Sequence, residues 1–215
     1  MKRTALLVTL SVALVVPAPA LAATDPGSAV GAPARAVSPA PTVTDADLLT
    51  VAQVAKVVPG YTGATRDTYR ERRTSLPNPG DCASDLSVPV ASARAGVYLP
   101  DGSPKVESML ARVDQLGSTA KARALMKKIK RFPSACRSFR QGDQRVRVTR
   151  LAAPRVGSDR FGMRLRSSSG SDSFQVDATF VRIGNRLVTV FLATKRFQQR
   201  TPYAPLTKMA VRRAR

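Results

Sequence analysis

The sequence lacks histidine and tryptophan altogether, and it contains only two cysteines and two glutamates. Without an imidazole, the chain cannot form a Ser-His-Asp or Cys-His nucleophile system, a His-ligated zinc site or a histidine general base. The twelve aspartates are scattered along the chain, so they offer little for a carboxylate metal cage or a glycosidase pair. We therefore expect no cofactor, no metal site and no enzyme activity.

The first residues have the composition of a secretory signal peptide. Lys2 and Arg3 form a charged start, an apolar core covers 5–16, and an A-x-A cleavage motif ends at Ala22. The apolar core is shorter than the roughly 20 residues that a membrane-spanning helix needs. The first cysteine is Cys82, so none stands at the cleavage point to carry a lipid. The pattern over 1–22 thus predicts a secreted, extracellular protein with a cleaved signal peptide and no transmembrane anchor.

Two further regions follow the predicted signal peptide. Residues 23–43 are rich in Ala, Pro, Gly and Ser, and their four prolines disfavour a helix or a paired strand. We interpret this stretch as a disordered linker. Residues 44–215 then form one domain of ordinary size, long enough to bury a core and without an internal repeat.

The two cysteines, Cys82 and Cys136, suit an exported protein, because disulfides persist outside the reducing cytosol. We expect them to form one disulfide bridge. A redox-active or nucleophilic cysteine is the alternative. It is disfavoured by the absence of a C-x-x-C motif and of a histidine that could lower the thiol pKa.

Hydrophobic periodicity predicts the secondary structure. Helices are expected over 45–58, 118–132 and 202–213, with Pro133 ending the second. Strands are expected over 64–72, 92–99, 106–116, 144–152, 160–167, 173–183 and 186–194, the last two joined by a two-residue turn at Gly184-Asn185. A helix is the alternative for 106–116, because its alternation is imperfect. The predicted fold class is α+β: a single antiparallel β-sheet with amphipathic helices packed on one face.

Basic residues dominate the charge, with 35 Lys and Arg against 14 Asp and Glu and a formal net charge of +21. In two predicted strands arginines alternate with apolar residues, so each arginine set should lie on the face opposite its apolar neighbours. The candidate anion-binding residues are Arg145, Arg147, Arg164 and Arg166 of the strands, with Lys127, Lys128 and Arg131 of the helix in support. Two interpretations stay open: a solvated surface without a partner, or salt-sensitive association with an anionic wall polymer or lipid surface.

Two other functions are considered on composition. Export and the lack of an aromatic stacking motif argue against nucleic acid as a partner. An extracytoplasmic hydrolase with a Ser/Lys pair is the alternative function, since Ser118 and Lys121 form one S-x-x-K match. The companion S-D-N and K-T-G motifs are absent, which favours Ser118 as a helix cap and Lys121 as a solvated residue of the first turn.

Several short segments, in this order and spacing, resemble one family. They are Leu48-Leu49, Gln53-Val54, Asp81-Cys82, the Phe-Pro-Ser-Ala-Cys run 132–136 and the hairpin 184–190. The order is similar to that of the extracellular sensor domain of PknH-type actinobacterial protein kinases and the secreted or lipid-anchored proteins that share it. Family members often have Trp where Phe132 stands and a second disulfide, and this chain has neither. The resemblance implies a one-domain antiparallel sheet with helices that acts as a non-catalytic binding or sensor module for an unspecified small ligand.

Overall fold

The computed structural model describes residues 42–74, 86–101, 107–141, 144–169, 172–195 and 197–215. The described elements are, in chain order, η1 (Asp45–Asp47), α1 (Val51–Ala55), η2 (Pro59–Tyr61), β1 (Thr65–Arg70), β2 (Ser92–Leu99), β3 (Ser108–Gln115), α2 (Thr119–Ala135), β4 (Ser138–Gln141), β5 (Gln144–Leu151), β6 (Asp159–Ser169), β7 (Asp172–Ile183), β8 (Arg186–Lys195) and α3 (Tyr203–Arg213). Within these ranges no helix has the length and apolar character needed to cross a membrane. The predicted signal peptide and nearly all of the predicted linker lie outside them. Val43, at the end of that linker, is buried in the core, so the folded domain includes it.

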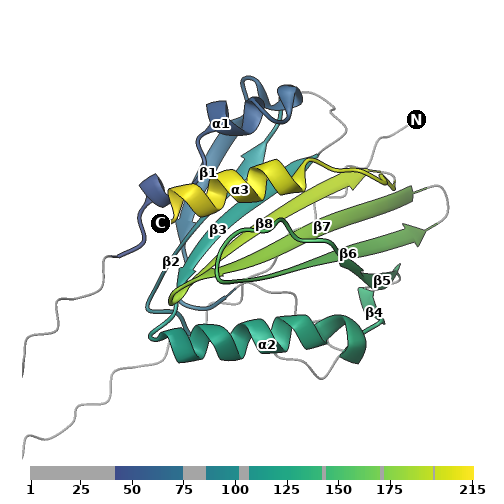
Figure 1. Cartoon of the computed structure of the whole chain (residues 1–215). Helices are drawn as coiled ribbons and strands as arrows, with labels where there is room; N and C mark the ends of the chain where they lie inside the picture. The colour runs from purple at the N-terminus through teal and green to yellow at the C-terminus, as the bar shows by residue number, and fades with distance from the viewer. Residues whose placement is uncertain (1–41, 75–85, 102–106, 142–143, 170–171, 196) are drawn as a thin grey trace, which may run out of the picture. The chain divides into compact units, whose positions relative to one another are not determined.

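The described strands form one sheet in the order β1-β2-β3-β8-β7-β6-β5-β4, and every neighbouring pair is antiparallel (Figure 1). The long strands β7 and β8 lie at its centre. The prediction of a single antiparallel sheet is confirmed. The hairpin between β7 and β8 is also confirmed, because Ile183 pairs with Arg186 across Gly184, whose φ of 57° lies in the left-handed region that glycine tolerates.

Helices cover both faces of this sheet, so the expectation that they pack on one face is wrong. On β7, Ala178 and Phe180 belong to the hydrophobic cluster that contains α2, whereas Val181 belongs to the cluster that contains α3. Thr179, on the same face as Val181, has its hydroxyl 2.6 Å from that of Thr207 in α3. Because successive side chains of a strand point to opposite faces, α2 and α3 lie on opposite faces, here called the α2 face and the α3 face.

The predicted helix over 45–58 is replaced by η1, α1 and η2, all on the α3 face (Figure 1). Two threonines cap in succession: the Thr44 N–H donates to Asp47 Oδ2 (2.8 Å), and the Gln53 N–H donates to Thr50 Oγ1 (3.2 Å). Between them Leu48 is extended, with φ −91° and ψ 158°. This break allows both Leu48 and Leu49 to be buried, which adjacent positions on one amphipathic helix do not favour.

Helix α2 begins where the sequence predicts, since Ser118 Oγ accepts the Lys121 N–H at 3.2 Å. Its apolar side is buried as expected, with Leu125, Met126 and Ile129 in contact with the sheet core. Pro133 does not end the helix, which continues to Ala135. The proline lacks an N–H and so removes one bond of the last turns, while its side chain is buried. Strand β4, which follows, was not among the predicted strands.

Cys136 caps the end of α2 and is buried, whereas Cys82 lies outside the described residues. The Cys82–Cys136 disulfide therefore stays a prediction. Closing a loop of that length would stabilise the fold by about 4 kcal/mol in the chain-entropy model. We expect no reactive thiol in denatured, unreduced, exported protein and two after reduction, counted with an alkylating reagent by mass spectrometry. Two reactive thiols before reduction would contradict the bridge.

Candidate functional site

The first arginine pair lies where the alternation predicts. Arg145 and Arg147 of β5 are exposed on the α3 face, while Val146 and Val148 between and beyond them are buried on the α2 face. Arg145 donates from its guanidinium to Ser138 Oγ of the neighbouring strand β4 at 3.2 Å. Helix α3 packs on β7 and β8, which lie nearer the middle of the sheet than β5. We call Arg145 and Arg147 the β5 arginine pair.

The second arginine pair is on the same face but is held by partners within the domain. Arg164 donates from Nε to Asp177 Oδ1 at 2.6 Å and from Nη2 to Asp177 Oδ2 at 2.7 Å, a bidentate ion pair with a fully buried carboxylate. Hydrogen bonding to Asp177 raises the pKa of Arg164. Arg166 donates to Gln175 Oε1 at 2.9 Å. Arg164 and Arg166 are therefore engaged within the domain, and their role as candidate anion-binding residues stays a prediction.

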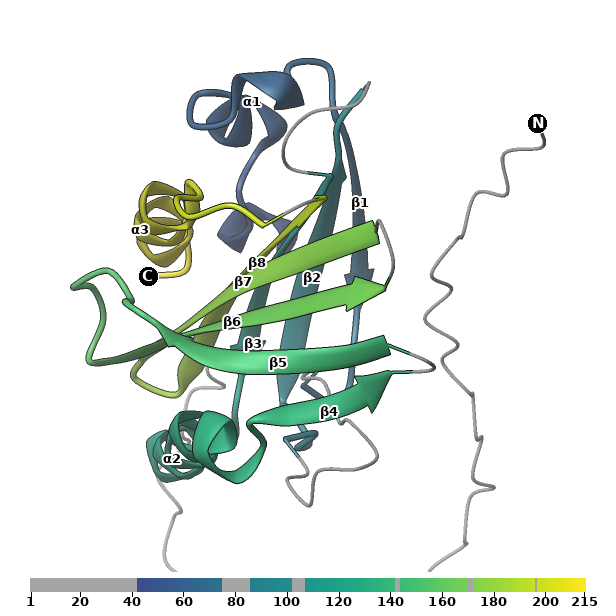
Figure 2. The ribbon, with the colours of Figure 1, turned by 90° about the vertical axis from the view of Figure 1, so that its right-hand side faces the viewer.

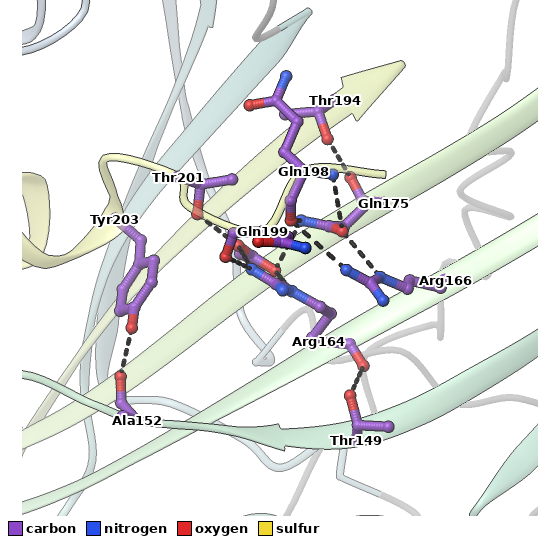
Figure 3. Close-up of polar contacts among 11 residues, drawn as sticks. Thr149, Ala152, Arg164, Arg166, Gln175, Thr194, Gln198, Gln199, Thr201 and Tyr203 are labelled. Atoms are coloured by element: carbon purple, nitrogen blue, oxygen red, sulfur yellow. Dashed lines mark hydrogen bonds and ion pairs between the residues drawn. The ribbon is translucent and has the colours of Figure 1, made fainter. Parts of the chain in front are cut away.

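A segment after β8 closes over this second pair, as Figure 3 shows. We call residues 197–203 the C-terminal strap. The carbonyls of Gln198 and Gln199 accept bonds from Arg166 and Arg164 at 3.4 Å, and the Thr201 hydroxyl donates to Asp177. The Phe197 ring lies 5.0 Å from the guanidinium carbon of Arg166, in cation–π geometry. These contacts make the second pair part of the fold.

Tyr203 anchors the far end of the strap, with its hydroxyl donating to the Ala152 carbonyl at 2.8 Å (Figure 3). Burial raises the pKa of Tyr203, the negative charge of Asp177 adds to this, and Arg164 partly opposes it. The phenol therefore remains a neutral donor over the physiological range, which suits a structural anchor.

A separate group of basic residues lines a groove of about 370 Å³ on the other side of the sheet, between α2 and the strands β5 and β6. Its lining residues are Arg123, Lys127, Lys130, Arg131, Ser134, Arg150 and Asp159. We call it the α2 groove. Five of these lining residues, 123 to 134, come from α2. They recur at helical spacing and form one stripe along the helix, next to its buried stripe. Lys127 and Arg131, two predicted residues, are brought together here, whereas Lys128 points elsewhere on the exposed side of the helix.

The predicted site residues do not include the other five members of the α2 groove: Arg123, Lys130, Ser134, Arg150 and Asp159. Arg123 carries a helical signal, because it lies one turn before Lys127. Arg150 and Asp159 come from strands, and only the packing of α2 on the sheet brings them near the helix. Lys130 Nζ lies 2.5 Å from Asp159 Oδ1, an ion pair that joins the helix to the start of β6.

The candidate Ser/Lys pair has a structural role. Ser118 Oγ accepts the backbone N–H of Lys121 as the cap of α2, and no hydrogen bond joins this oxygen to Lys121 Nζ in the described structure. Lys121 is exposed. A serine nucleophile needs its base within hydrogen-bond reach, so this geometry favours the cap.

Comparison with known proteins identifies the fold. No protein-family model matches the sequence, and no curated protein is significantly similar to it. Among solved structures, the chain is similar to the extracellular domain of PknH from Mycobacterium tuberculosis, with a TM-score of 0.57 and 12% identity over 79% of this chain and 91% of that one. An Rv0999 ortholog from Mycobacterium smegmatis matches with a TM-score of 0.42 and 12% identity over 76% of this chain and 97% of that one. The domain thus has the fold of the PknH extracellular domain.

Proposed function

We propose that the protein is an exported, non-catalytic, sensor-like binding module that associates with an anionic polymer of the cell envelope through the β5 arginine pair. The observation that carries the proposal is the exposure of Arg145 and Arg147 side by side on the α3 face, in a chain with a formal net charge of +21. The fold shared with an extracellular domain supports an extracytoplasmic location, as does the predicted signal peptide.

A polymer is preferred to a lipid surface because the domain offers little for membrane insertion. Among the described residues, the exposed large apolar side chains are Leu99 and Phe197. Phe197 already stacks on Arg166. Interfacial binding to a bilayer usually adds an apolar face to the electrostatic attraction. Arginine pairs bind phosphate or carboxylate groups well without that face, because the planar guanidinium forms two parallel hydrogen bonds.

The test uses the Arg145→Glu/Arg147→Glu variant in co-sedimentation with purified cell walls across a salt series. We expect wild-type retention at low salt that falls steeply toward 0.1 M or more, since exposed charges are screened over about 10 Å there. The variant should bind at least about tenfold more weakly, because each basic residue near an anionic surface contributes about 1 kcal/mol. Arg164 and Arg166 are left intact, because reversing them would break the contacts that hold the strap.

The matched control is Lys208→Glu/Arg212→Glu, which makes the same charge change at two exposed positions of α3. It should retain most of the binding. Equal loss in both variants would show that net charge alone drives retention, and no retention of the wild type at low salt would refute the proposal. Anionic vesicles in a parallel series distinguish a lipid surface from a wall polymer.

A further inference from the structure

The α2 groove concentrates positive charge that its single carboxylate neutralises only in part. Five basic side chains and one carboxylate give its lining a formal charge of +4. Asp159 is engaged by Lys130, and the remaining cations are Arg123, Lys127, Arg131 and Arg150. Within the part of the chain that the structure describes, these four side chains make no hydrogen bond and no ion pair.

Such a cluster has an electrostatic cost, because like charges that line one concave surface repel each other. Three less exposed arginines of this domain are offset by acids: Arg164 by Asp177, Arg186 by Asp47 and Arg112 by Asp114. In the α2 groove, one carboxylate faces five basic side chains. An anion bound between the helix and β5 would remove the repulsion and would satisfy guanidinium donors from two different elements.

We propose that the α2 groove binds a ligand that carries two or more phosphate groups. Phosphate suits the lining because guanidinium groups bind its oxygens in pairs, while lysine ammonium groups and the Ser134 hydroxyl supply single donors. A volume of about 370 Å³ lies within the range of small-ligand sites and exceeds what a single phosphate fills. The charge of +4 also matches a ligand with several negative charges.

The C-terminal end of a helix disfavours an anion, and Arg131 and Ser134 lie in the last turns of α2. The helix dipole there is equivalent to roughly half a negative charge. This is small beside the formal charge of +4 on the groove lining. The cationic side chains, and not the backbone, therefore determine the preference of the groove.

This site goes beyond the proposed function, because it lies on the α2 face whereas the β5 arginine pair lies on the α3 face. Figure 2 shows α2 and α3 on opposite sides of the sheet. The same phosphate chemistry is found in a free oligophosphate and in a phospholipid headgroup that carries two or more phosphate groups. Both sources are tested below with separate probes.

The first experiment is calorimetric titration of the full mature chain with inorganic tripolyphosphate at low salt. In the groove variant Lys127→Gln/Arg131→Gln we expect binding to weaken by at least about tenfold, since two charge-assisted contacts are lost. The matched control is Lys121→Gln/Lys128→Gln, which removes the same charge from exposed positions of the same helix outside the groove. It should bind within about twofold of the wild type. Arg150→Gln, on the strand wall, tests the groove without changing α2.

Three results would overturn the proposal: no binding of tripolyphosphate to the wild type, equal weakening in the groove and control variants, or unchanged binding in both Lys127→Gln/Arg131→Gln and Arg150→Gln. Vesicles containing cardiolipin, whose headgroup carries two phosphate groups, form the second arm. Groove-dependent retention on them identifies a lipid headgroup as the source, and retention independent of the groove leaves the free oligophosphate. The Arg145→Glu/Arg147→Glu variant should bind tripolyphosphate normally, so failure of the proposed wall association and failure of this site are separate results.

Discussion

Replacing Asp177 by alanine should lower the free energy of unfolding by about 3–5 kcal/mol, because it leaves the Arg164 guanidinium without its partner in a largely buried position. Both carboxylate oxygens are used. Oδ1 accepts from Arg164 and from Gln175 Nε2 at 3.3 Å, and Oδ2 accepts from Arg164 and from the Thr201 hydroxyl. The substitution therefore breaks the ion pair and one attachment of the C-terminal strap together. Urea unfolding followed by circular dichroism measures the change.

The matched control is Glu107→Gln, which removes a carboxylate that pairs with Lys195 on the surface. The Lys195 side chain is 71% exposed, so this pair should contribute no more than about 1 kcal/mol. The double variant Arg164→Met/Asp177→Leu should be less destabilised than Asp177→Ala, because it leaves no unpaired charge. A loss below about 1 kcal/mol for Asp177→Ala would mean that the buried pair does not stabilise the domain.

The arginine contacts show what alternation predicts and what it does not. Period two places Arg145, Arg147, Arg164 and Arg166 on one face, and the structure agrees. Alternation does not say which arginines stay exposed. The sequence does carry a signal for this, because the β6–β7 hairpin register sets Arg164 opposite Asp177. Cross-strand partners of opposite charge are expected to interact, so a register-based reading predicts the ion pair.

The C-terminal strap and the α2 groove were beyond the sequence pattern for a different reason. The strap contributes backbone carbonyls from Gln198 and Gln199. Every residue has a backbone carbonyl, so the residue type does not indicate which ones accept a hydrogen bond. The groove needs Arg150 of β5 beside Arg123 and Lys127 of α2, which depends on the packing of the helix across the sheet. Which face each helix covers was likewise not predictable from amphipathicity, because the central strands are buried on both sides.

N-terminal capping explains why residues 45–58 do not form the single helix that was predicted. Thr44 and Thr50 are both good N-caps, and a single helix over 45–58 would place the second cap inside the helix. The second cap divides that segment, and the burial of adjacent Leu48 and Leu49 is the sequence feature consistent with a break. Helix 118–132 was predicted well because one cap and one apolar stripe agree over four turns.

A second buried carboxylate should make stability depend on pH. Asp114 of β3 accepts from Arg112 Nε at 2.6 Å, and Arg112 also contacts Glu71 and donates to the Arg73 carbonyl. Burial raises the pKa of Asp114 to about 6, and the charge and hydrogen bonds of Arg112 only partly oppose this. Arg112 is itself 2% exposed, so the pair is held away from water that would stabilise the ionised carboxylate.

The folded pKa of Asp114 lies above its ordinary value of 3.8, so the folded state binds this proton more tightly than the unfolded state does. The stabilisation is fully present below pH 3.8 and is lost as pH rises through about 6, by an amount on the order of 3 kcal/mol. Asparagine cannot ionise. The stability of Asp114→Asn relative to wild type should therefore rise between pH 4 and pH 7, measured as urea midpoints in matched buffers. The comparison cancels the titration of the other carboxylates. A difference that is constant over this range, or that falls, would show that Arg112 holds Asp114 ionised throughout.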